Sequence, residues 1–360
     1  MQLESLRTLL ASRQPLAREP GGVASSLGLE AFAHMPTQLA CFLAAAETFL
    51  ADAVVEEMVG LAADGTLAVV PLCRGKERFA RWRIVGSREV FEPVDALAGS
   101  AEAMAALAEG LARQPRPLSF DRIPAESPLI PAVQAAMQGK GWVSLRPAVA
   151  RPVITLDASW ADPATRFNSG RQSDFRRAAR KAERHGTVAY EVLAPTPAEF
   201  DALFTEAVAV ELRSWKKESG TAIGVDRRKH DFFQRFFRAA AEDGLCRIAF
   251  MRIGGQAVAM QLALEWDGRF WLFKIGYDAA FRDCSPGNLL MLHTIGHAAT
   301  RGLERYELLG NTEDWISTFW TREQLPCLRL RTYPANLRGA WAAASDAFSC
   351  LSHRLARRGG

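Results

Sequence analysis

One stretch of the chain, residues 245–310, constrains the fold more than any other. It holds three runs of mainly aliphatic, aromatic and alternating polar residues, then a helical run and a short further strand. The three runs span residues 245–253, 256–266 and 269–277. Gly254-Gly255 separates the first two runs, and Asp267-Gly268 separates the last two. Two-residue turns of this kind join neighbouring antiparallel strands. The stretch therefore predicts a three-stranded meander followed by a helix and a strand.

The rest of the chain repeats a similar order of elements. The first half predicts an Ala-rich helical segment from 36 to 64 and strands at 66–73 and 79–85. A helix, strand, helix and strand are expected to follow at 101–112, 118–121, 129–138 and 142–149. The second half predicts a strand at 187–193 and helices at 197–213 and 227–242 before the meander. This order is typical of an α+β protein with a mixed sheet. The two halves share no obvious sequence repeat, so only the order of elements suggests a duplication.

The length of 360 residues allows one large or two medium domains. We predict five segments: an N-terminal lead-in, a first half, a basic connecting helix, a second half and an amphipathic C-terminal helix. Their expected bounds are residues 1–45, 46–160, 161–186, 187–335 and 336–360. The basic segment is rich in arginine and lysine. It could bind an anion, but charge runs on helices are usually solvated, so we favour a solvated connecting helix.

Composition excludes several classes of protein. Six cysteines are scattered without a CxxC pair, which argues against a zinc site or a disulfide framework. A net charge of +4 is too small and too dispersed to indicate a nucleic-acid partner. His293 and His297 lie on one helical face without an HExxH pattern, so we expect a packed face and no metal site. No apolar run approaches the ~20 residues needed to span a bilayer, and a cytoplasmic location is expected.

The central hairpin predicts a polar site within the sheet. Counting back from the Asp267-Gly268 turn places Gln261 opposite Lys274, among alanine and glycine on one face. Such a face suits the floor of a ligand site. The alternative is that Lys274 pairs with an internal carboxylate such as Glu307 or Glu265, and the two interpretations are compatible.

The loop after the meander predicts an anion site. Ser285 and Pro286 stand where a helix begins, as N-cap and first helical residue, and Gly287 leaves room for a close approach. The N–H groups at such a terminus suit a phosphate or pyrophosphate, with Arg282 and Asn288 as helpers. The alternative is a capped helix that binds nothing.

The order and spacing of these motifs resemble one bacterial branch of the GNAT acyltransferases. This branch is described as CelD/BcsL-type or cellulose-biosynthesis-associated, and it is related to the FemAB-like aminoacyl ligases. The resemblance covers residues 64–333. It rests on several short motifs: Ala257-Val258-Ala259, Tyr277-Asp278, Ser285-Pro286-Gly287-Asn288-Leu289-Leu290, Gly302, Glu307-Leu308-Leu309-Gly310 and, upstream, residues 211–216 with Gly220 and the basic helix at 171–184. Two departures stand out. Glu307 replaces a frequent Asp, and residues 311–320 lack the Tyr-Lys pair that commonly follows the final glycine.

The resemblance implies a GNAT-like fold, with two tandem GNAT-like halves of which the second is active. It implies no permanently bound cofactor and acyl-CoA as cosubstrate, with the pyrophosphate at residues 282–289, that is Arg282, Ser285, Pro286, Gly287, Asn288 and Leu289. An amine would attack the thioester directly, which requires a base and stabilisation of the oxyanion. Glu307 is the expected base, Lys274 and Gln261 are positioning groups, and Tyr277 is the expected proton donor to the thiolate. The expected acceptor-binding residues are Trp215, Lys216, Gly310, Trp315 and Trp320.

The C-terminal segment carries one apolar helical stripe flanked by arginines. Its members are Leu337, Trp341, Ala344, Phe348, Leu351 and Leu355. We favour a terminal helix whose stripe packs on the domain. The alternative is peripheral docking on an anionic membrane, at the inner face, which would suit a lipid acceptor.

The sequence therefore predicts an acyl-CoA-dependent N-acyltransferase that modifies an amine of a cell-envelope metabolite. The acceptor is a small amine, such as an amino sugar of an exopolysaccharide, or an amino lipid such as a sphingoid base. The alternatives are a FemAB-like ligase that uses aminoacyl-tRNA and a non-catalytic module that keeps the fold. The acceptor, the acyl length and the oligomeric state stay open.

Overall fold

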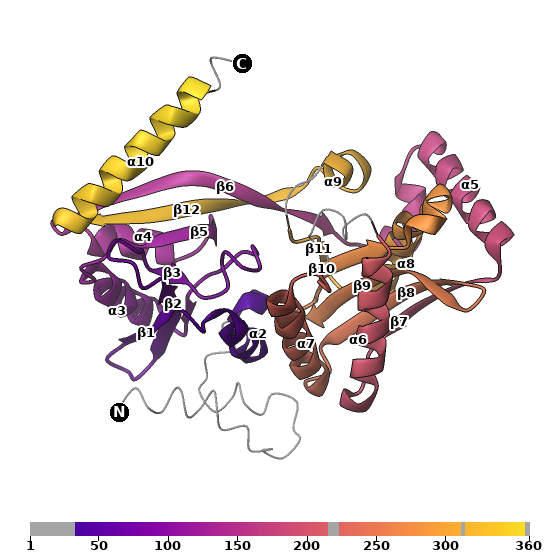
Figure 1. The fold of residues 1–360 in the computed structure, drawn as a ribbon, viewed down its shortest axis with the longest axis horizontal. Coiled ribbons are helices and arrows are strands. Elements are labelled where there is room, and N and C mark those ends of the chain that lie inside the picture. Colours follow the sequence, from indigo (N-terminus) through magenta and orange to yellow (C-terminus); the bar gives the residue numbers. More distant parts are fainter. Residues whose placement is uncertain (1–32, 215–222, 311–313, 357–360) are drawn as a thin grey trace. The chain divides into compact units, whose positions relative to one another are not determined.

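The protein, described here from a computed structural model, divides into two compact units (Figure 1). The structure describes residues 33–214, 223–310 and 314–356. The first unit combines Met1–Ala150 with Leu325–Gly360, and the second is Arg151–Gln324. The expected bounds placed residues 325–335 in the second half. These residues group with the first unit because strand β12 pairs there with β5.

The first unit is built on two sets of strands. Its elements are η2 (Pro36–Gln38), α2 (Ala40–Ala46), η3 (Glu47–Phe49), β1 (Val54–Leu61), β2 (Leu67–Arg74), β3 (Arg83–Ile84), β4 (Leu97–Ala98), α3 (Ala101–Ala112), β5 (Ser119–Pro124), α4 (Leu129–Ala136), β6 (Gly141–Thr155), β12 (Gln324–Pro334) and α10 (Leu337–Ala356). Strands β3 and β4 both pair with β2, and β1 lies on its other side. In the second set the order is β5-β12-β6.

Two predictions for this unit are wrong. The helix expected from 36 to 64 ends at Ala46, and strand β1 follows it. Val54 and Val55 favour a strand, and β1 pairs with β2 across the Asp64-Gly65 turn. The expected strand at 79–85 is reduced to the short β3. Helix α3, in contrast, has the predicted bounds.

The second unit contains one mixed sheet with helices on both faces. Its elements are η4 (Ala158–Ala161), η5 (Pro163–Arg166), α5 (Ser169–His185), β7 (Val188–Leu193), α6 (Pro197–Leu212), α7 (Arg227–Glu242), β8 (Cys246–Ile253), β9 (Gln256–Trp266), β10 (Arg269–Tyr277), η6 (Ala279–Cys284), α8 (Pro286–Thr300), β11 (Arg305–Glu307) and α9 (Asp314–Phe319). The sheet order is β6-β11-β10-β9-β8-β7, where β6 contributes the end of its long strand.

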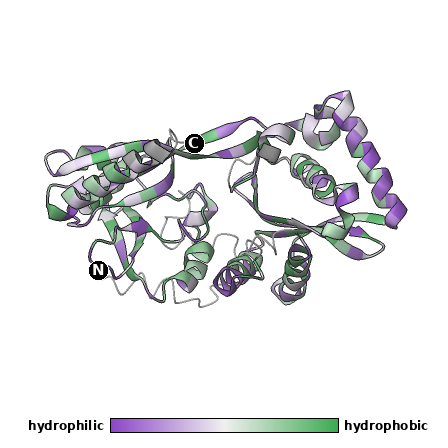
Figure 2. Ribbon diagram, turned by 45° about the horizontal axis from the view of Figure 1, so that its top comes forward, coloured by the Kyte–Doolittle hydropathy of each residue, from purple (hydrophilic) through white to green (hydrophobic). Residues whose placement is uncertain are grey.

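Hydrophobic faces of the helices hold this sheet between two layers (Figure 2). Helix α8 covers one face with an apolar side that includes Met291 and Ile295. Helices α6 and α7 cover the other face, where the rings of Phe236 and Phe237 pack on Phe273 of β10. The predicted three-stranded meander is confirmed, and its strands begin and end within one residue of their expected positions.

Candidate active site

A β-bulge at Phe273 decides which residues of the central hairpin share a face. Up to Leu272 the pairing of β10 with β9 follows the expected register, with Arg269 opposite Trp266. The register then shifts, so that Lys274 lies opposite Leu262 and Ile275 lies opposite Gln261. An extra residue in one strand reverses the faces of all residues beyond it. The prediction that Gln261 and Lys274 oppose each other is therefore wrong, because the two side chains lie on opposite faces of the sheet.

Gln261 belongs to a buried polar network under α8. The hydroxyl of Tyr306 donates to Gln261 Oε1 at 3.2 Å and lies 2.9 Å from Oγ1 of Thr294. All three side chains are buried, and burial raises the pKa of Tyr306. The network satisfies polar groups within the core. We therefore assign Gln261 a structural position.

The opposite face of the hairpin brings Lys274 to the side where α6 packs. Its neighbour on the same face, Gly276, allows α6 to approach, since a Cβ built on Gly276 would lie 3.0 Å from Cα of Glu211. Glu211 is fully buried, and its Oε2 accepts a hydrogen bond from the backbone N–H of Ile223 at 2.8 Å. Lys274 is half-buried, with Nζ 4.8 Å from the ring centre of Phe233.

Glu307 ends the short strand β11 on this same face. Its register partners are Trp271 of β10 and Val153 of β6. The carboxylate is fully buried, and its Oε2 lies 3.6 Å from Nη1 of Arg151. Arg151 would compete with a substrate ammonium for this carboxylate. Glu307 could therefore act as the base only after this ion pair is broken.

Strands β10 and β11 separate directly beyond Glu307. They pair in parallel over Arg269–Trp271 and Arg305–Glu307. The next residue, Leu308, donates its N–H to Pro152 of β6, and Leu309 and Gly310 then turn with φ of 49° and 57°. In the described part of the chain, β10 continues to Tyr277 without pairing to β11. The parallel pairing of β10 with β11 therefore ends at Trp271, well before the end of β10.

The N-terminus of α8 lies at the end of β10 that is away from the β11 pairing. Ser285 occupies the N-cap position but adopts a left-handed conformation (φ 48°), and its side chain makes no capping hydrogen bond. The predicted helix start is confirmed, whereas the predicted side-chain cap is wrong. Pro286 has no N–H, and a Cβ on Gly287 would lie 3.4 Å from Cδ1 of Tyr277. The predicted anion loop and Tyr277 are therefore neighbours.

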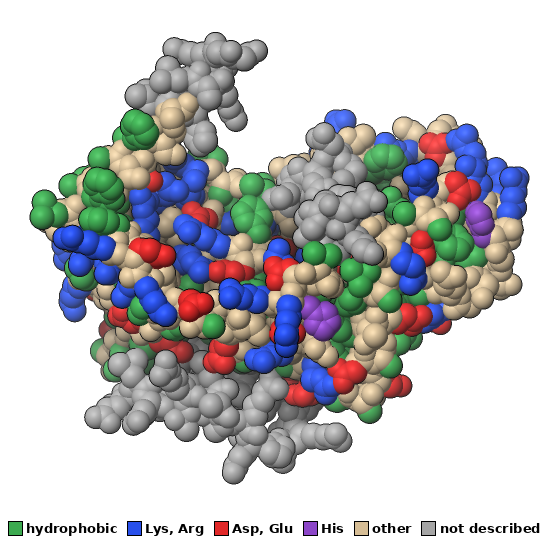
Figure 3. Space-filling model, in the orientation of Figure 1, with side chains coloured by type: hydrophobic (Ala, Val, Ile, Leu, Met, Phe, Trp, Pro, Cys, Tyr) green, Lys and Arg blue, Asp and Glu red, His purple; other side chains and the backbone are tan. Residues whose placement is uncertain are grey.

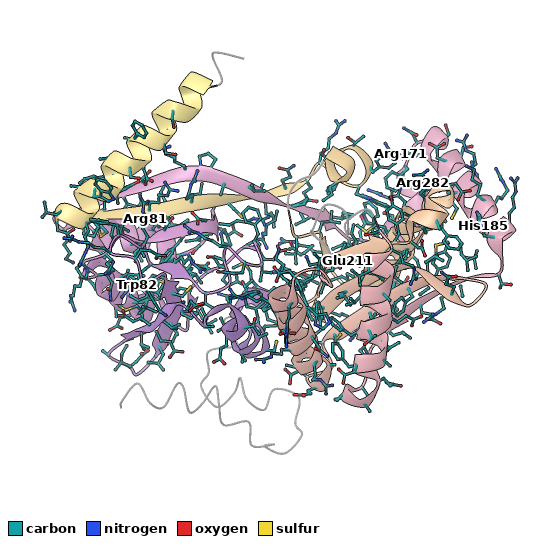
Figure 4. All side chains as sticks on the ribbon, in the orientation of Figure 1. Arg81, Trp82, Arg171, His185, Glu211 and Arg282 are labelled. Atoms are coloured by element: carbon teal, nitrogen blue, oxygen red, sulfur yellow. The ribbon has the colours of Figure 1, made fainter. Side chains whose placement is uncertain are left out.

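The basic helix α5 packs beside this loop. Lys181 donates to the carbonyl oxygen of Asp283 at 3.2 Å, and His185 lies 3.4 Å from the Asp283 carboxylate. Arg282 is exposed on η6 (Figure 4). Phe175 and Ala182 are buried on the inner side of α5. The interpretation of this segment as a merely solvated connection is therefore too weak, because α5 borders the predicted anion site and adds positive charge to it (Figure 3, upper right).

Two connections missed by the sequence reading fix the end of α6. Arg213 Nε donates to Asp278 Oδ2 at 2.6 Å, and the N–H of Ala279 donates to the carbonyl of Arg213 at 3.1 Å. Ile223 returns to Glu211 on the same helix. Arg213 and Ile223 are thus both connected near the end of β10. The upstream motif at 211–216 was the available signal, but it indicated only family likeness.

The residues expected to bind the acceptor lie in different parts of the second unit, and some lie outside the described residues. Trp320 is buried and packs against Phe167 and Phe175 at 5.8 Å and 6.2 Å between ring centres, which makes it part of the core beneath α5. Gly310 lies in the turn after β11. Trp215 and Lys216 lie outside the described residues, as does the side chain of Trp315 in α9. Of the histidines, His293 stacks on Tyr190 and His297 faces Glu265 at 3.9 Å.

Helix α3 of the first unit, which we compare with α8, has a side-chain cap at its N-terminus. The Ser100 side chain accepts a hydrogen bond from the N–H of Ala103 at 3.1 Å. Strand β1 packs so closely that a Cβ on Gly60 would lie 2.2 Å from the backbone nitrogen of Leu107. Of the two helices, α8 alone therefore starts without a side-chain cap and with a glycine in its first turn.

Comparison with known proteins places this architecture in the GNAT fold. Residues 169–316 match the acetyltransferase (GNAT) domain family. A search of curated proteins found no matching sequence. Among solved structures, the C-terminal domain of a proposed lysylphosphatidylglycerol synthetase from Agrobacterium fabrum is similar, with a TM-score of 0.53 and 13% identity over 90% of this chain and 94% of that one.

Two further structures show the same likeness. FemX has a TM-score of 0.51 and 12% identity, with 93% of this chain and 96% of that chain covered. A protein of unknown function from Bacteroides thetaiotaomicron has a TM-score of 0.52 and 11% identity, with 92% and 97% covered. The chain therefore has a GNAT-type acyltransferase fold, as the sequence predicted. The CelD/BcsL branch stays a prediction.

Proposed function

We propose that the protein is an N-acyltransferase that takes an acyl group from acyl-CoA. The observation that carries this proposal is the joint placement of two features in the second unit. The uncapped glycine start of α8 lies beside Tyr277, at the end of β10, and β10 has by then separated from β11. A phosphate site and an open strand edge thus lie within reach of one extended ligand.

The donor would bind with its pyrophosphate at the start of α8. Pro286 has no N–H, and those of Asn288 and Leu289 donate to the Ser285 carbonyl, so the Gly287 N–H and the positive end of the helix dipole would favour the anion. Arg282 and Asn288 can add side-chain contacts, and Lys181 of α5 adds positive charge near Asp283. The pantetheine would then run along β10 beyond its pairing with β11, where main-chain groups of the strand would align it.

Transfer would proceed by attack of an amine nitrogen on the thioester carbonyl carbon. A C–N bond forms and the C–S bond breaks, while the oxyanion is held by N–H groups of β10. The amine loses a proton to a base, and the departing thiolate gains one, for which the sequence predicts Tyr277 as donor. Glu307 is the proposed base, provided that the substrate ammonium displaces Arg151 from its carboxylate. Lys274 would act as a positioning group.

We propose an amine of a cell-envelope metabolite as the acceptor, either an amino sugar or a long-chain amino lipid. The likeness to a proposed lysylphosphatidylglycerol synthetase supports an envelope acceptor at the level of fold only. The second candidate is a FemAB-like ligase that uses aminoacyl-tRNA, which the likeness to FemX favours. The two candidates differ in the donor, so donor binding separates them.

Thermal unfolding with a panel of acyl-CoAs of increasing chain length tests the proposal. A ligand at a hundred times its Kd stabilises the folded state by about 2.7 kcal/mol. For a unit of this size we expect a rise in Tm of roughly 5–10 °C. Pantetheine, which lacks the pyrophosphate, should give a much smaller shift. Absence of a shift with any acyl-CoA would contradict the proposal, and a preference for long chains would favour a lipid acceptor.

A further inference from the structure

Helix α10 packs on the first unit with its small and polar face. Asp346 accepts hydrogen bonds from Arg81 at 2.7 Å and 2.9 Å and from the hydroxyl of Tyr333 at 2.7 Å, and it pairs with Arg331 at 2.8 Å. Ala342 is buried one turn earlier. These contacts fix the rotation of the helix about its own axis, so they also determine which face points outward.

The outward face is the apolar stripe. Leu337 is 89% exposed, Trp341 57% and Phe348 76%. At about 100° per residue, these three positions fall within roughly 40° of one another, and Asp346 lies on the opposite side. A terminal helix that served only to cover its own domain would bury this stripe. The expected terminal helix does pack on the domain, but through Ala342 and Asp346 and not through the stripe.

Aromatic and cationic side chains from a second segment extend this surface. Phe79 is 47% exposed, and its ring centre lies 5.3 Å from that of Trp341. The guanidinium of Arg78 lies over Phe79 at 5.5 Å, and Arg116 donates to the Arg78 carbonyl at 2.8 Å. Hydrophobic and basic side chains gather at the same end of the unit (Figure 3, left).

Two more arginines join this group. Burial and then the positive charges of Arg74 and Arg338 lower the pKa of Arg116. The same turn also carries Glu77, so the local charge is not purely positive. The arginines still outnumber it, and one of them, Arg78, lies over the exposed ring of Phe79.

We propose that the outer face of α10, together with Arg78, Phe79, Arg116 and Arg338, docks on an anionic lipid surface. Exposed Trp, Phe and Leu beside arginines is the composition of an interfacial helix. The arginines would meet the lipid phosphates while the stripe enters the boundary between head groups and acyl chains. No helix in the described residues is long and apolar enough to cross a membrane, so this contact would be peripheral.

Two other partners fit the outer face of α10 less well than a lipid surface does. A nucleic acid would be attracted by the arginines but would leave Leu337 and Phe348 in water. A second copy related by a two-fold axis would cover the stripe but would bring two arginine groups together, which costs free energy unless anions intervene. These occupants are alternative outcomes of the test.

Co-sedimentation of the full chain with vesicles tests the proposal. We expect binding to phosphatidylcholine vesicles that contain phosphatidylglycerol, little binding to phosphatidylcholine alone, and weakening by salt. The L337S/F348S variant changes only exposed side chains and should lower binding about tenfold or more. The matched control is L61S, at a residue of β1 that is 62% exposed, which should bind as the wild type does.

A second pair of variants tests how much the arginines contribute to vesicle binding. R78Q/R338Q should weaken binding by about fivefold for each arginine removed. The control R227Q/R228Q removes two exposed arginines of α7 in the second unit and should leave binding unchanged. None of these residues belongs to the proposed donor site, so the Tm shift with acyl-CoA should be the same in all variants, and the two proposals can fail separately.

Three results would overturn the lipid proposal. One is vesicle binding that does not depend on phosphatidylglycerol or on the stripe. Another is binding to a duplex or transfer RNA that is lost in R78Q/R338Q while vesicles are not bound. The third is a dimer, seen by light scattering, that L337S/F348S converts to a monomer without any vesicle binding by the wild type.

Discussion

The Gly287→Asp variant separates an anion site from a plain helix start. Gly287 is the second residue of α8, after Pro286, and a Cβ there would be in ordinary contact with Tyr277 at 3.4 Å. The new side chain is therefore accommodated. An acidic residue in the first turn also interacts favourably with the helix dipole, by about 0.3–1 kcal/mol. The free energy of unfolding should stay the same or rise slightly.

Binding of the donor should fall in the same variant. A carboxylate about 4 Å from a pyrophosphate charge costs about 4 kcal/mol at an effective dielectric constant of 20, and partial screening leaves about 3 kcal/mol. This corresponds to roughly a hundredfold increase in Kd. Loss of affinity without loss of stability is a combination that damage to the fold would not produce.

Helix α5 offers a matched control. Gly170 is also the second residue of its helix, it is exposed, and Asn168 caps that helix through its side chain. The Gly170→Asp variant should gain the same small dipole stabilisation and keep the affinity for the donor. Calorimetric titration with coenzyme A, together with urea unfolding of each variant, gives both quantities. Equal affinities for the two variants would refute the proposed pyrophosphate site.

Three further predictions concern other parts of the second unit. Glu307→Gln removes one partner of a buried ion pair and should lower the free energy of unfolding by roughly 3 kcal/mol, measured in urea; if turnover persists in full, Glu307 is not the base. Replacing Arg213 and Asp278 singly and together should give a coupling energy of about 1 kcal/mol in a double-mutant cycle, because the pair is partly exposed. Burial lowers the pKa of His293 and His297 below 6.5, so the folded state binds fewer protons than the unfolded state, and stability should fall as the pH drops through 6.5. A double His→Gln variant should flatten this dependence in thermal unfolding between neutral and mildly acidic pH.

Local sequence signals predicted the meander and most helices because each has its own boundary chemistry. Asp267-Gly268 closes a hairpin, and Thr196 and Asp226 begin α6 and α7 at the expected residues. Strand β1 was missed because alanines before it favour a helix, and only its pairing with β2 reveals the strand. The pairing of β12 with β5 could not be predicted either, because strands so distant in sequence leave no local pattern.

The candidate site was less predictable because it depends on two backbone irregularities. The left-handed conformation of Ser285 occurs at a residue type that usually caps through its side chain, so the sequence indicated the helix start but not its open geometry. The bulge at Phe273 has no turn residue or glycine to announce it. Correct strand boundaries therefore coexisted with a wrong assignment of faces.

The bulge also changes which residues can act together on the acceptor. It turns Lys274 and Gly276 toward α6, where Glu211 is buried against Gly276, and this is the face that also carries Glu307. Two carboxylates and one amine thus share a face, whereas Gln261 is held in the core on the other. The N–H of Ile223 also donates to Glu211 at this face. Acceptor recognition should therefore respond to changes at Glu211, while donor affinity should respond to Gly287.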